Sequence, residues 1–417
     1  MSQTIAEKVL SKHSRSECSA GDTVVASVDF CMAQDGTSSL MIGDLEALGF
    51  EAPKTTNGMA LVLDHNAPCP SADVARIHSR IRGFASRWAI PLYDVGEGVC
   101  HQVIPESGRV LPGDLVVGAD SHTCTYGALN VCSTGMGSAD VAASAFTGTL
   151  WFRVPESFSI SVEGALSDRV SPKDVILAVI GELSADGATY KSVEFKGSTI
   201  DAMDIDGRMT VANMAVEMGA KFCPFHFDDK TREWFAEKGI RETEPVASDD
   251  DAEFESSFEV DAADIVPKVS MPHKVDSVRD VADVGDIEVQ QIFLGTCTNG
   301  RLGDLRVAAS LLRGRKVKSG LRFIVAPASR KVFLAALEEG IVSSLVRSGA
   351  VFVTPGCGPC VGTHAGVPSD GDNVLSTANR NFKGRMGNND GVGIYLCSPE
   401  TAAASAITGR ITDPREL

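Results

Sequence analysis

The chain has 417 residues, of which 43% are hydrophobic, so it is long enough to bury a sizeable core in more than one domain. Its formal net charge of -17 argues against non-specific binding to nucleic acids or to anionic membranes, which requires basic surfaces. No segment approaches the roughly twenty consecutive apolar residues of a membrane span, and residues 1–10 lack the apolar core of a signal peptide.

Cysteine usage bounds the cellular compartment. The chain carries 11 cysteines, an odd number, without a recognisable secretion signal. A framework of disulfides is therefore not expected, and the sequence predicts a cytoplasmic protein. Most cysteines in such a compartment are buried apolar residues, and a few bind metals or take part in catalysis.

The first third of the chain alternates short apolar runs with polar residues. Met59 to Leu63, Ile90 to Tyr93 and Leu115 to Gly118 are predicted strands, and each is followed by polar side chains. Residues 248–264 are acidic and lack periodicity, so we expect a loop or linker there. Domain boundaries are expected near 156 and 286, giving the segments 1–156, 157–285 and 286–417.

The last third has the clearest pattern. Glu288 to Leu294, Arg322 to Ala326 and Ala350 to Val353 are predicted strands, separated by helical patterns. One helix begins after the turn that contains Cys297, and Ser329 is placed to cap the other. This order of strand, helix, strand, helix and strand predicts a parallel sheet with right-handed crossovers, and hence an α/β fold.

Chemically reactive side chains follow several of these strands. In open α/β sheets, ligands bind beyond the carboxyl ends of the strands. The residues concerned come from both ends of the chain, and if their strands share one orientation we expect them to converge on one site: Asp64, His65, His101, Asp120, Ser121, His122, Cys297, Cys357 and Cys360.

The cysteine pattern leaves three interpretations open. Cys357-Gly-Pro-Cys360 is a thioredoxin-like redox motif when it stands alone. Here the motif lies late in a long chain, Gly356 precedes it, and Cys297 offers a third thiol in a similar glycine-flanked turn. From spacing alone, a redox dithiol, a structural zinc site and an iron-sulfur cluster are equally compatible with these residues.

Two further patterns are weaker by themselves. Asp120-Ser121-His122 contains the residue types of a hydrolase triad, but neighbouring residues point in different directions, so adjacency proves nothing. The stretch from Asn379 to Arg385 is locally basic in an acidic protein. Such a stretch is either a solvated face or a clamp for carboxylates, and the acidity of the rest favours the clamp.

Taken together, short stretches along the whole chain resemble the aconitase superfamily, in particular the large subunits of 3-isopropylmalate dehydratase and homoaconitase. They occur in the order of that family: MAQDGT at 32–37, LDH at 63–65, HQVIPESG at 101–108, GADSHTCTYGA at 118–128, GATYKSVEF at 187–195, GTCTNGR at 295–301, GCGPCVG at 356–362 and STANRNFKGRMG at 376–387.

The resemblance implies three α/β domains around a 4Fe-4S cluster. Cys297, Cys357 and Cys360 match the cluster ligands, which leaves one iron open to the substrate as a Lewis acid. The family's further domain, which swivels over the site, has no match in this chain. The resemblance therefore implies that a separate small subunit supplies that domain.

The resemblance also assigns roles to other residues. Asp64, His65 and His101 match the group that protonates the leaving hydroxyl, and Asp120 and His122 match a second acidic pair. Glu194 matches the carboxylate that helps the hydroxyl to leave. The positions that match substrate-binding or neighbouring loop residues are Gln34, Ser121, Asn379, Arg380 and Arg385.

The reaction implied is the reversible dehydration and rehydration of a hydroxy di- or tricarboxylate. The expected conversion is 2-isopropylmalate to 3-isopropylmalate, in leucine biosynthesis. Homoaconitase and dimethylmalate or citramalate dehydratase are alternatives within the class. A thiol-disulfide oxidoreductase or a zinc-organised binding module are alternatives from other classes. Gln34 leaves the substrate open, because many isopropylmalate enzymes of this family have histidine at the matching position.

Overall fold

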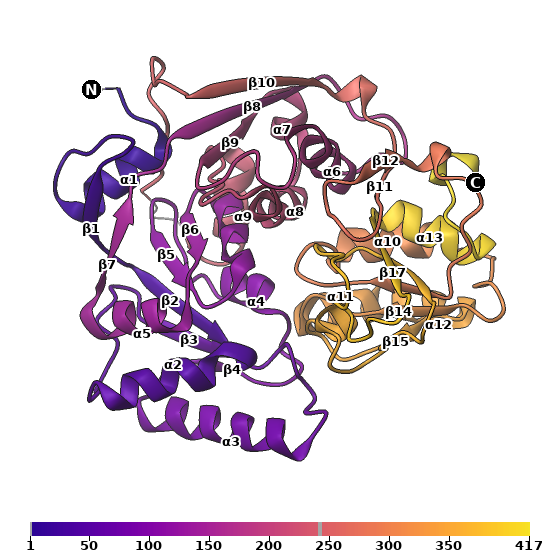
Figure 1. Ribbon diagram of the computed structural model, residues 1–417, viewed down its shortest axis with the longest axis horizontal. Helices are drawn as coiled ribbons and strands as arrows, with labels where there is room; N and C mark the ends of the chain where they lie inside the picture. The colour runs from indigo at the N-terminus through magenta and orange to yellow at the C-terminus, as the bar shows by residue number, and fades with distance from the viewer. Residues whose placement is uncertain (1, 241–243) are drawn as a thin grey trace.

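The computed structural model describes residues 2–240 and 244–417. The chain forms three sheet-centred units, coloured from indigo to yellow along the sequence in Figure 1. The first unit lies at the left of that view, the second carries the long strands across the top, and the third lies at the right. No helix in the described part of the chain is long and apolar enough to cross a membrane.

The first unit is built on a five-stranded parallel sheet with helices on both faces. Its strands, in spatial order, are β4 (Leu92–Tyr93), β3 (Met59–Val62), β2 (Phe30–Gln34), β5 (Leu115–Gly118) and β6 (Cys132–Gly135). Around it lie α1 (Ile5–Ser14), α2 (Asp35–Ala47), α3 (Ala72–Arg87), α4 (Cys100–Glu106), η1 (Ser121–Leu129) and α5 (Ser138–Thr147). An antiparallel pair, β1 (Thr23–Ser27) and β7 (Thr149–Arg153), completes it.

Side chains of this sheet alternate between two apolar cores. Met32 and Val116 pack into the core that extends toward the other two units, while Ala33 and Val117 pack against the outer helices. This period of two is what a strand buried on both faces requires. The chain changes direction between β2 and β5, which makes the region beyond these two strands a topological switch point.

The second unit has a smaller parallel sheet. Its strands are β10 (Ser256–Asp261), β8 (Ser157–Glu163) and β9 (Ser192–Lys196). The helical elements are α6 (Pro172–Leu183), α7 (Ser198–Ala202), α8 (Ile205–Ala215), η2 (Val216–Met218), α9 (Asp229–Glu237) and η3 (Ala262–Asp264). The expectation of a loop over residues 248–264 is wrong for β10, in which Phe258 and Val260 alternate with exposed residues on an edge strand.

The third unit contains a seven-stranded sheet. Its strands are β12 (Val278–Asp280), β11 (Lys268–Ser270), β17 (Gly393–Cys397), β16 (Asn373–Ser376), β13 (Gln291–Leu294), β14 (Arg322–Val325) and β15 (Val351–Phe352). Its helical elements are η4 (Val281–Asp283), α10 (Leu302–Leu311), α11 (Arg330–Glu338), α12 (Ile341–Ser348), η5 (Gly358–Val361), α13 (Pro399–Thr408) and η6 (Pro414–Glu416).

The strands predicted in the last third are confirmed, and β17, β16, β13, β14 and β15 run parallel. Ser329 caps α11 by accepting the N–H of Val332, as expected. However, β11 and β12 pair with this sheet in antiparallel fashion although they precede residue 286. The third sheet therefore draws on chain to the N-terminal side of the expected boundary.

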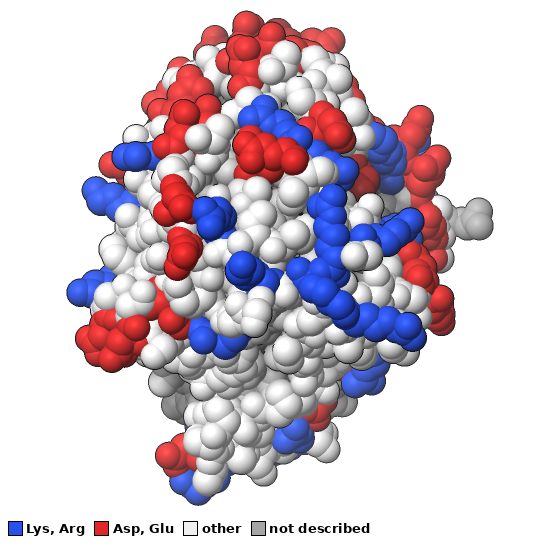
Figure 2. Space-filling model, turned by 90° about the vertical axis from the view of Figure 1, so that its right-hand side faces the viewer, with Lys and Arg blue, Asp and Glu red and all other residues white. Residues whose placement is uncertain are grey.

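Charge is unevenly distributed over the face of the molecule that lies at the right of Figure 1. Figure 2 shows acidic side chains gathered toward the top and the edges of the view, with lysines and arginines grouped nearer the middle. Basic side chains thus gather locally although the chain as a whole has a net charge of -17.

Candidate active site

A pocket of about 200 Å³ lies where the first and third units meet. It is lined by residues from turns that follow strands in both units: Gln34, His65, His101, Asp120, Ser121, His122, Thr296, Cys297, Cys357, Cys360, Val361, Asn379, Arg380 and Arg385. Both sheets present a switch point here, because β13 lies between β16 and β14 just as β2 lies between β3 and β5. Residues far apart in the sequence therefore meet at one place.

Two hydrogen bonds to backbone carbonyl groups join the units at this pocket. The N–H of Cys357 donates to the carbonyl oxygen of Asp64 at 2.9 Å, and His364 Nε2 lies 3.0 Å from the carbonyl oxygen of His65. Gly356 permits the first contact, because it has φ +150° and a Cβ there would lie 2.9 Å from the same Asp64 oxygen. The cysteine turn is thus fixed against the turn that carries Asp64.

The turn after β3 is held by a carboxylate on α2. Asp35 accepts the backbone N–H groups of Asp64 at 3.2 Å, His65 at 2.8 Å and Asn66 at 2.8 Å. Asp64 is fully buried, and its carboxylate accepts from His65 Nδ1 at 2.8 Å and from the N–H of Cys100 at 2.7 Å. The orientation of the His65 ring is therefore set by its neighbour Asp64.

Asp120 stands at the centre of a second set of hydrogen bonds. Its carboxylate accepts from His101 Nε2 at 2.7 Å and from the N–H of His122 at 2.9 Å, and His65 Nε2 lies 3.4 Å away. Burial raises the pKa of this carboxyl, but the adjacent imidazoles outweigh burial and hold its pKa well below the ordinary value. Asp120 is therefore an anion that orients the rings around it.

His101 is placed for proton transfer. Its side chain is 1% exposed, and burial lowers its pKa. Because the ionised Asp120 can only accept, Nε2 carries the ring proton of neutral His101 and Nδ1 has a free lone pair. Nδ1 lacks a hydrogen-bond partner among the described residues. A buried ring nitrogen without a partner is available to a bound molecule.

A buried glutamate that the sequence did not single out links two of the predicted residues. Glu217, on η2, accepts from His122 Nε2 at 2.7 Å and from Arg380 Nε at 2.8 Å. Burial raises the pKa of Glu217, but His122 and Arg380 together lower this pKa by more than burial raises it, so the carboxylate is ionised. Its only local signal is a charged residue inside the apolar run Val216–Met218, ahead of Gly219.

Glu194 requires a correction. The sequence-based role at the leaving hydroxyl places this residue in the pocket, but it does not line the pocket. Its carboxylate accepts the hydroxyl of Ser248 at 2.8 and 2.9 Å and the N–H of Ile5 at 3.1 Å. The side chain on β9 thus contacts the N-terminal segment and Ser248. Glu217, and not Glu194, is the carboxylate that contacts the pocket residues His122 and Arg380.

The three cysteines are 5%, 4% and 3% exposed at Cys297, Cys357 and Cys360. Two pocket residues donate toward their sulfur atoms: Asn379 Nδ2 lies 3.4 Å from Cys297 Sγ, and Arg385 Nη2 lies 3.3 Å from Cys360 Sγ. Burial raises the pKa of Cys297 to about 12 and also raises that of Cys357. Buried thiols of this kind ionise when a cation binds them.

The donor set discriminates between kinds of metal centre. Asp64, His65 and Cys357 offer ligand atoms within 4.8 Å of one another, as the ligands of a single ion must be. However, Asp64 and His65 already hydrogen-bond each other and other partners. Thiolates on different irons of one cluster lie farther apart than the ligands of one ion. Three thiols around one pocket, with donors to sulfur, therefore fit a cluster better than a single zinc ion.

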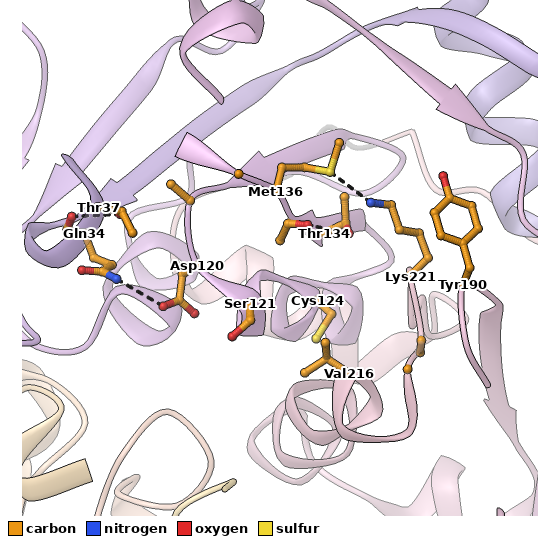
Figure 3. Close-up of a pocket in the computed structure, with 15 residues that line it drawn as sticks. Gln34, Thr37, Asp120, Ser121, Cys124, Thr134, Met136, Tyr190, Val216 and Lys221 are labelled. Atoms are coloured by element: carbon orange, nitrogen blue, oxygen red, sulfur yellow. Dashed lines mark hydrogen bonds between the residues drawn. The ribbon is translucent and has the colours of Figure 1, made fainter. Parts of the chain in front are cut away.

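A second pocket of about 590 Å³ adjoins this one and shares Gln34, Asp120 and Ser121 with it. Figure 3 shows Gln34 and Asp120 on one side of this space and Lys221 and Tyr190 on the other. Gln34 Nε2 is 3.5 Å from Asp120 Oδ2, and Ser121 Oγ is 3.3 Å from His122 Nδ1. The two pockets together give the site an opening toward the second unit.

Thiols beside imidazole–carboxylate pairs and arginines define an enzyme site for acid–base chemistry on an anionic substrate. The comparisons with known proteins name the family. The model of the aconitase family (aconitate hydratase) matches residues 7–286 and 279–409, and the chain belongs to this family. It is an enzyme of the hydro-lyase class, and the family implies a 4Fe-4S cluster.

Several relatives match over the full length. The chain is 50% identical to 3-isopropylmalate dehydratase large subunit 2 of Archaeoglobus fulgidus, over all of both chains. It is 48% identical to 3-isopropylmalate dehydratase large subunit 1 of Thermotoga maritima, again over all of both. It is 49% identical to the probable methanogen homoaconitase large subunit of Methanosarcina mazei, over 94% of this chain and 100% of that protein.

One solved structure supports the fold alone. Aconitase X of Thermococcus kodakaraensis in its holo-form superimposes with a TM-score of 0.53 at 12% identity, over 88% of each chain. The predicted α/β architecture of the aconitase type is thereby confirmed.

Proposed function

We propose that this chain is the cluster-binding large subunit of a 3-isopropylmalate dehydratase, which interconverts 2- and 3-isopropylmalate by dehydration and rehydration in the cytoplasm. The observation that carries the proposal is the meeting of Cys297, Cys357 and Cys360 with two arginines and the His101–Asp120 pair in one pocket. The names of the full-length relatives add the substrate class.

The three cysteines would hold the 4Fe-4S cluster, with one iron left without a protein ligand. When bound, the cluster supplies a Lewis acid that polarises the substrate's hydroxyl group. Asn379 and Arg385 are placed to stabilise the sulfur charge at Cys297 and Cys360. Arg385 Nε lacks a partner among the described residues, which leaves one guanidinium donor for a substrate carboxylate.

In this proposal the arginines orient the substrate by binding its carboxylates. Arg380 uses Nε for Glu217, and its side chain is 27% exposed, so its terminal nitrogens are available to a carboxylate. Glu217 fixes the plane of the Arg380 guanidinium and so orients its terminal N–H groups for bidentate binding of a carboxylate. Gln34 and Ser121 stand where the two pockets join and would contact the part of the substrate that extends toward the second unit.

Proton transfer falls to the imidazole–carboxylate pairs. Asp120 keeps His101 in the tautomer whose Nδ1 lone pair faces no protein partner, so Nδ1 is the atom that would take up a proton and deliver it to the leaving hydroxyl. Asp64 orients His65 on the other side of Asp120. His122 and Arg380 both donate hydrogen bonds to Glu217, so this carboxylate fixes the two side chains relative to each other.

Dehydration also requires a base for the carbon-bound proton, on the face opposite the departing hydroxyl. Several relatives are named as large subunits, so we propose that a separate small subunit supplies this base and closes the pocket. The substrate, a dicarboxylate anion, would then be held between the arginines and the partner.

The test is an anaerobic hydration assay of the unsaturated acids. The chain alone is expected to bind the cluster but to show almost no hydration, and addition of a small subunit should restore activity with isopropylmaleate. Activity with homoaconitate only would select the homoaconitase alternative, which the relative in Methanosarcina mazei favours. Full activity without a partner would contradict the two-subunit proposal.

A further inference from the structure

A second reactive group lies outside the pocket, on the first unit. Cys69 is exposed, whereas every other cysteine of the chain is buried. Its Sγ lies 3.2 Å from Nδ1 of His78, on α3. Nε2 of the same ring lies 3.1 Å from Oδ2 of Asp35. Thiol, imidazole and carboxylate thus form a continuous chain of hydrogen bonds that runs inward from the surface.

Burial distinguishes this arrangement from a chance surface contact. His78 is 0% exposed and Asp35 is 3% exposed, while the thiol at the other end reaches solvent. Burial raises the pKa of Asp35, but hydrogen bonds from His78 and from backbone N–H groups, together with the charge of His65, lower it far below its ordinary value. Asp35 is therefore an anion that supports a positive charge on His78.

Hydrogen-bond chemistry fixes the protonation of the ring. An ionised carboxylate only accepts, so Nε2 of His78 carries a proton toward Asp35. Nδ1 then faces the sulfur in one of two forms: it accepts the thiol proton, or it donates a proton to the thiolate. The two forms differ only by proton transfer from Cys69 to His78, which a carboxylate behind the imidazole favours.

A neighbouring cation adds to the effect. Arg82, one turn beyond His78 on α3, interacts electrostatically with Cys69 and pairs with Asp94. The imidazole of His78 can take the thiol proton and the guanidinium of Arg82 can offset charge on the sulfur, which favours nucleophilic attack by Cys69. The thiol of Cys69 has no part in the proposed dehydration, although Asp35 also holds the turn of Asp64 and His65.

We propose that Cys69 is a reactive thiol site, activated by His78 and Asp35, whose substrate class is hydroperoxides. The thiolate attacks the terminal peroxide oxygen, an S–O bond forms and the O–O bond breaks. Sulfur is oxidised by two electrons to a sulfenic acid, and the peroxide is reduced. The departing alkoxide or hydroxide takes the proton from Nδ1 of His78, so one thiol and one hydroperoxide give one sulfenic acid and one alcohol or water.

The inner end of this chain contacts the turn that carries the predicted acid–base residues. Oδ2 of Asp35 accepts both from His78 and from the N–H of Asn66, while Oδ1 accepts from Asp64 and His65. The activating carboxylate is therefore held by several donors, which keeps His78 fixed beneath the thiol. This fixed geometry is what distinguishes an activated cysteine from a mobile one.

The experiment measures alkylation of Cys69 by iodoacetamide between pH 5.5 and 9, followed peptide by peptide by mass spectrometry on the full chain. A matched control is Ser86→Cys in a Cys69→Ser background, which places an exposed thiol one turn beyond Arg82 on α3, so that the comparison isolates the contribution of His78 and Asp35. At pH 6 we expect Cys69 to react at least about tenfold faster than the control thiol, and His78→Gln to remove most of that difference. Treatment with one equivalent of hydrogen peroxide should give a dimedone adduct on the Cys69 peptide.

Equal rates for Cys69 and the control thiol, both rising only above pH 8, would overturn the proposal. So would a rate that His78→Gln leaves unchanged, because His78 would then not be the activating group. If His78→Gln does not fold, the comparison with the Ser86→Cys control decides the matter by itself. A dimedone adduct on buried cysteines with none on Cys69 would also contradict the assignment.

Discussion

Replacing Glu194 by glutamine separates the two candidate roles of this residue. Its carboxylate accepts hydrogen bonds from Ser248 and from the backbone of Ile5, and burial raises its pKa from 4.5 to about 7. Since the pKa is raised in the folded chain, the stability linked to this group is fully present below pH 4.5 and is lost as the pH rises through 7. Glutamine keeps an acceptor for both donors and carries no charge.

The difference between a pKa of 4.5 and one of about 7 corresponds to an upper limit of about 3 kcal/mol, at about 1.4 kcal/mol per pH unit. Above pH 8, where the buried carboxylate is ionised, Glu194→Gln should therefore raise the free energy of unfolding by up to about 3 kcal/mol. At pH 5 the expected gain falls to about 1 kcal/mol, because most of the wild-type carboxyl is protonated there.

Denaturant midpoints at pH 5 and pH 8.5, measured by circular dichroism on wild type and variant, give both values. Hydration activity with the partner subunit is measured on the same preparations, and Glu217→Gln is the matched variant. We expect Glu194→Gln to keep most of its activity and Glu217→Gln to lose at least about 100-fold, since Glu217 holds His122 and Arg380. Loss of activity without a pH-dependent gain in stability for Glu194→Gln would refute this reasoning and return Glu194 to the site.

Three further sets of substitutions test separate parts of the site. Serine is placed singly at each proposed ligand position: Cys297, Cys357 and Cys360. Iron content after anaerobic reconstitution should fall sharply in these variants, because a soft thiolate binds iron far better than an alcohol does. The control Cys31→Ser should keep an iron content near that of the wild type. Arg380→Lys keeps the charge but loses the fork, so KM should rise at least about tenfold while the cluster's absorption spectrum stays the same. Burial lowers the pKa of Lys221 from 10.5 to about 8, so the stability linked to its neutral form is lost as the pH falls through 8. Lys221→Met should therefore stabilise the chain by up to roughly 3 kcal/mol at pH 7 and by little at pH 10.5. Denaturant midpoints at the two pH values measure this difference.

Strand ends were predictable from the sequence because local signals mark them. The apolar runs before Asp64, Asp120 and Cys297 are short and end in polar or glycine-rich turns, and the structure has strands there. Strand β10 was missed because its acidic surroundings outweigh the alternation of Phe258 and Val260. Edge strands bury only one face, so their apolar signal is half that of a central strand.

The meeting of the turns was not predictable in the same way. Periodicity gives parallel strands within one sheet, but it does not say that two sheets face each other with their switch points together. Glu217 illustrates the difference. It lies 95 residues from His122 and 163 residues from Arg380 in the sequence, and no local pattern connects the three. The packing of α8 and η2 against η1 brings Glu217 to His122, and the turn after β16 brings Arg380 to the same carboxylate.

Charge pairing explains how an acidic protein can hold an anionic substrate at this pocket. The carboxylates around it are committed: Asp64 to His65 and Cys100, Asp120 to His101, and Glu217 to His122 and Arg380.

Each of these pairings places negative charge next to a cation or a ring proton, which reduces the repulsion that a dicarboxylate would meet. The donors that lack a partner among the described residues include Arg385 Nε, and the terminal nitrogens of the partly exposed Arg380 face the same pocket. The pocket therefore offers guanidinium groups to a carboxylate while its own acids are neutralised, although the chain as a whole carries a net charge of -17.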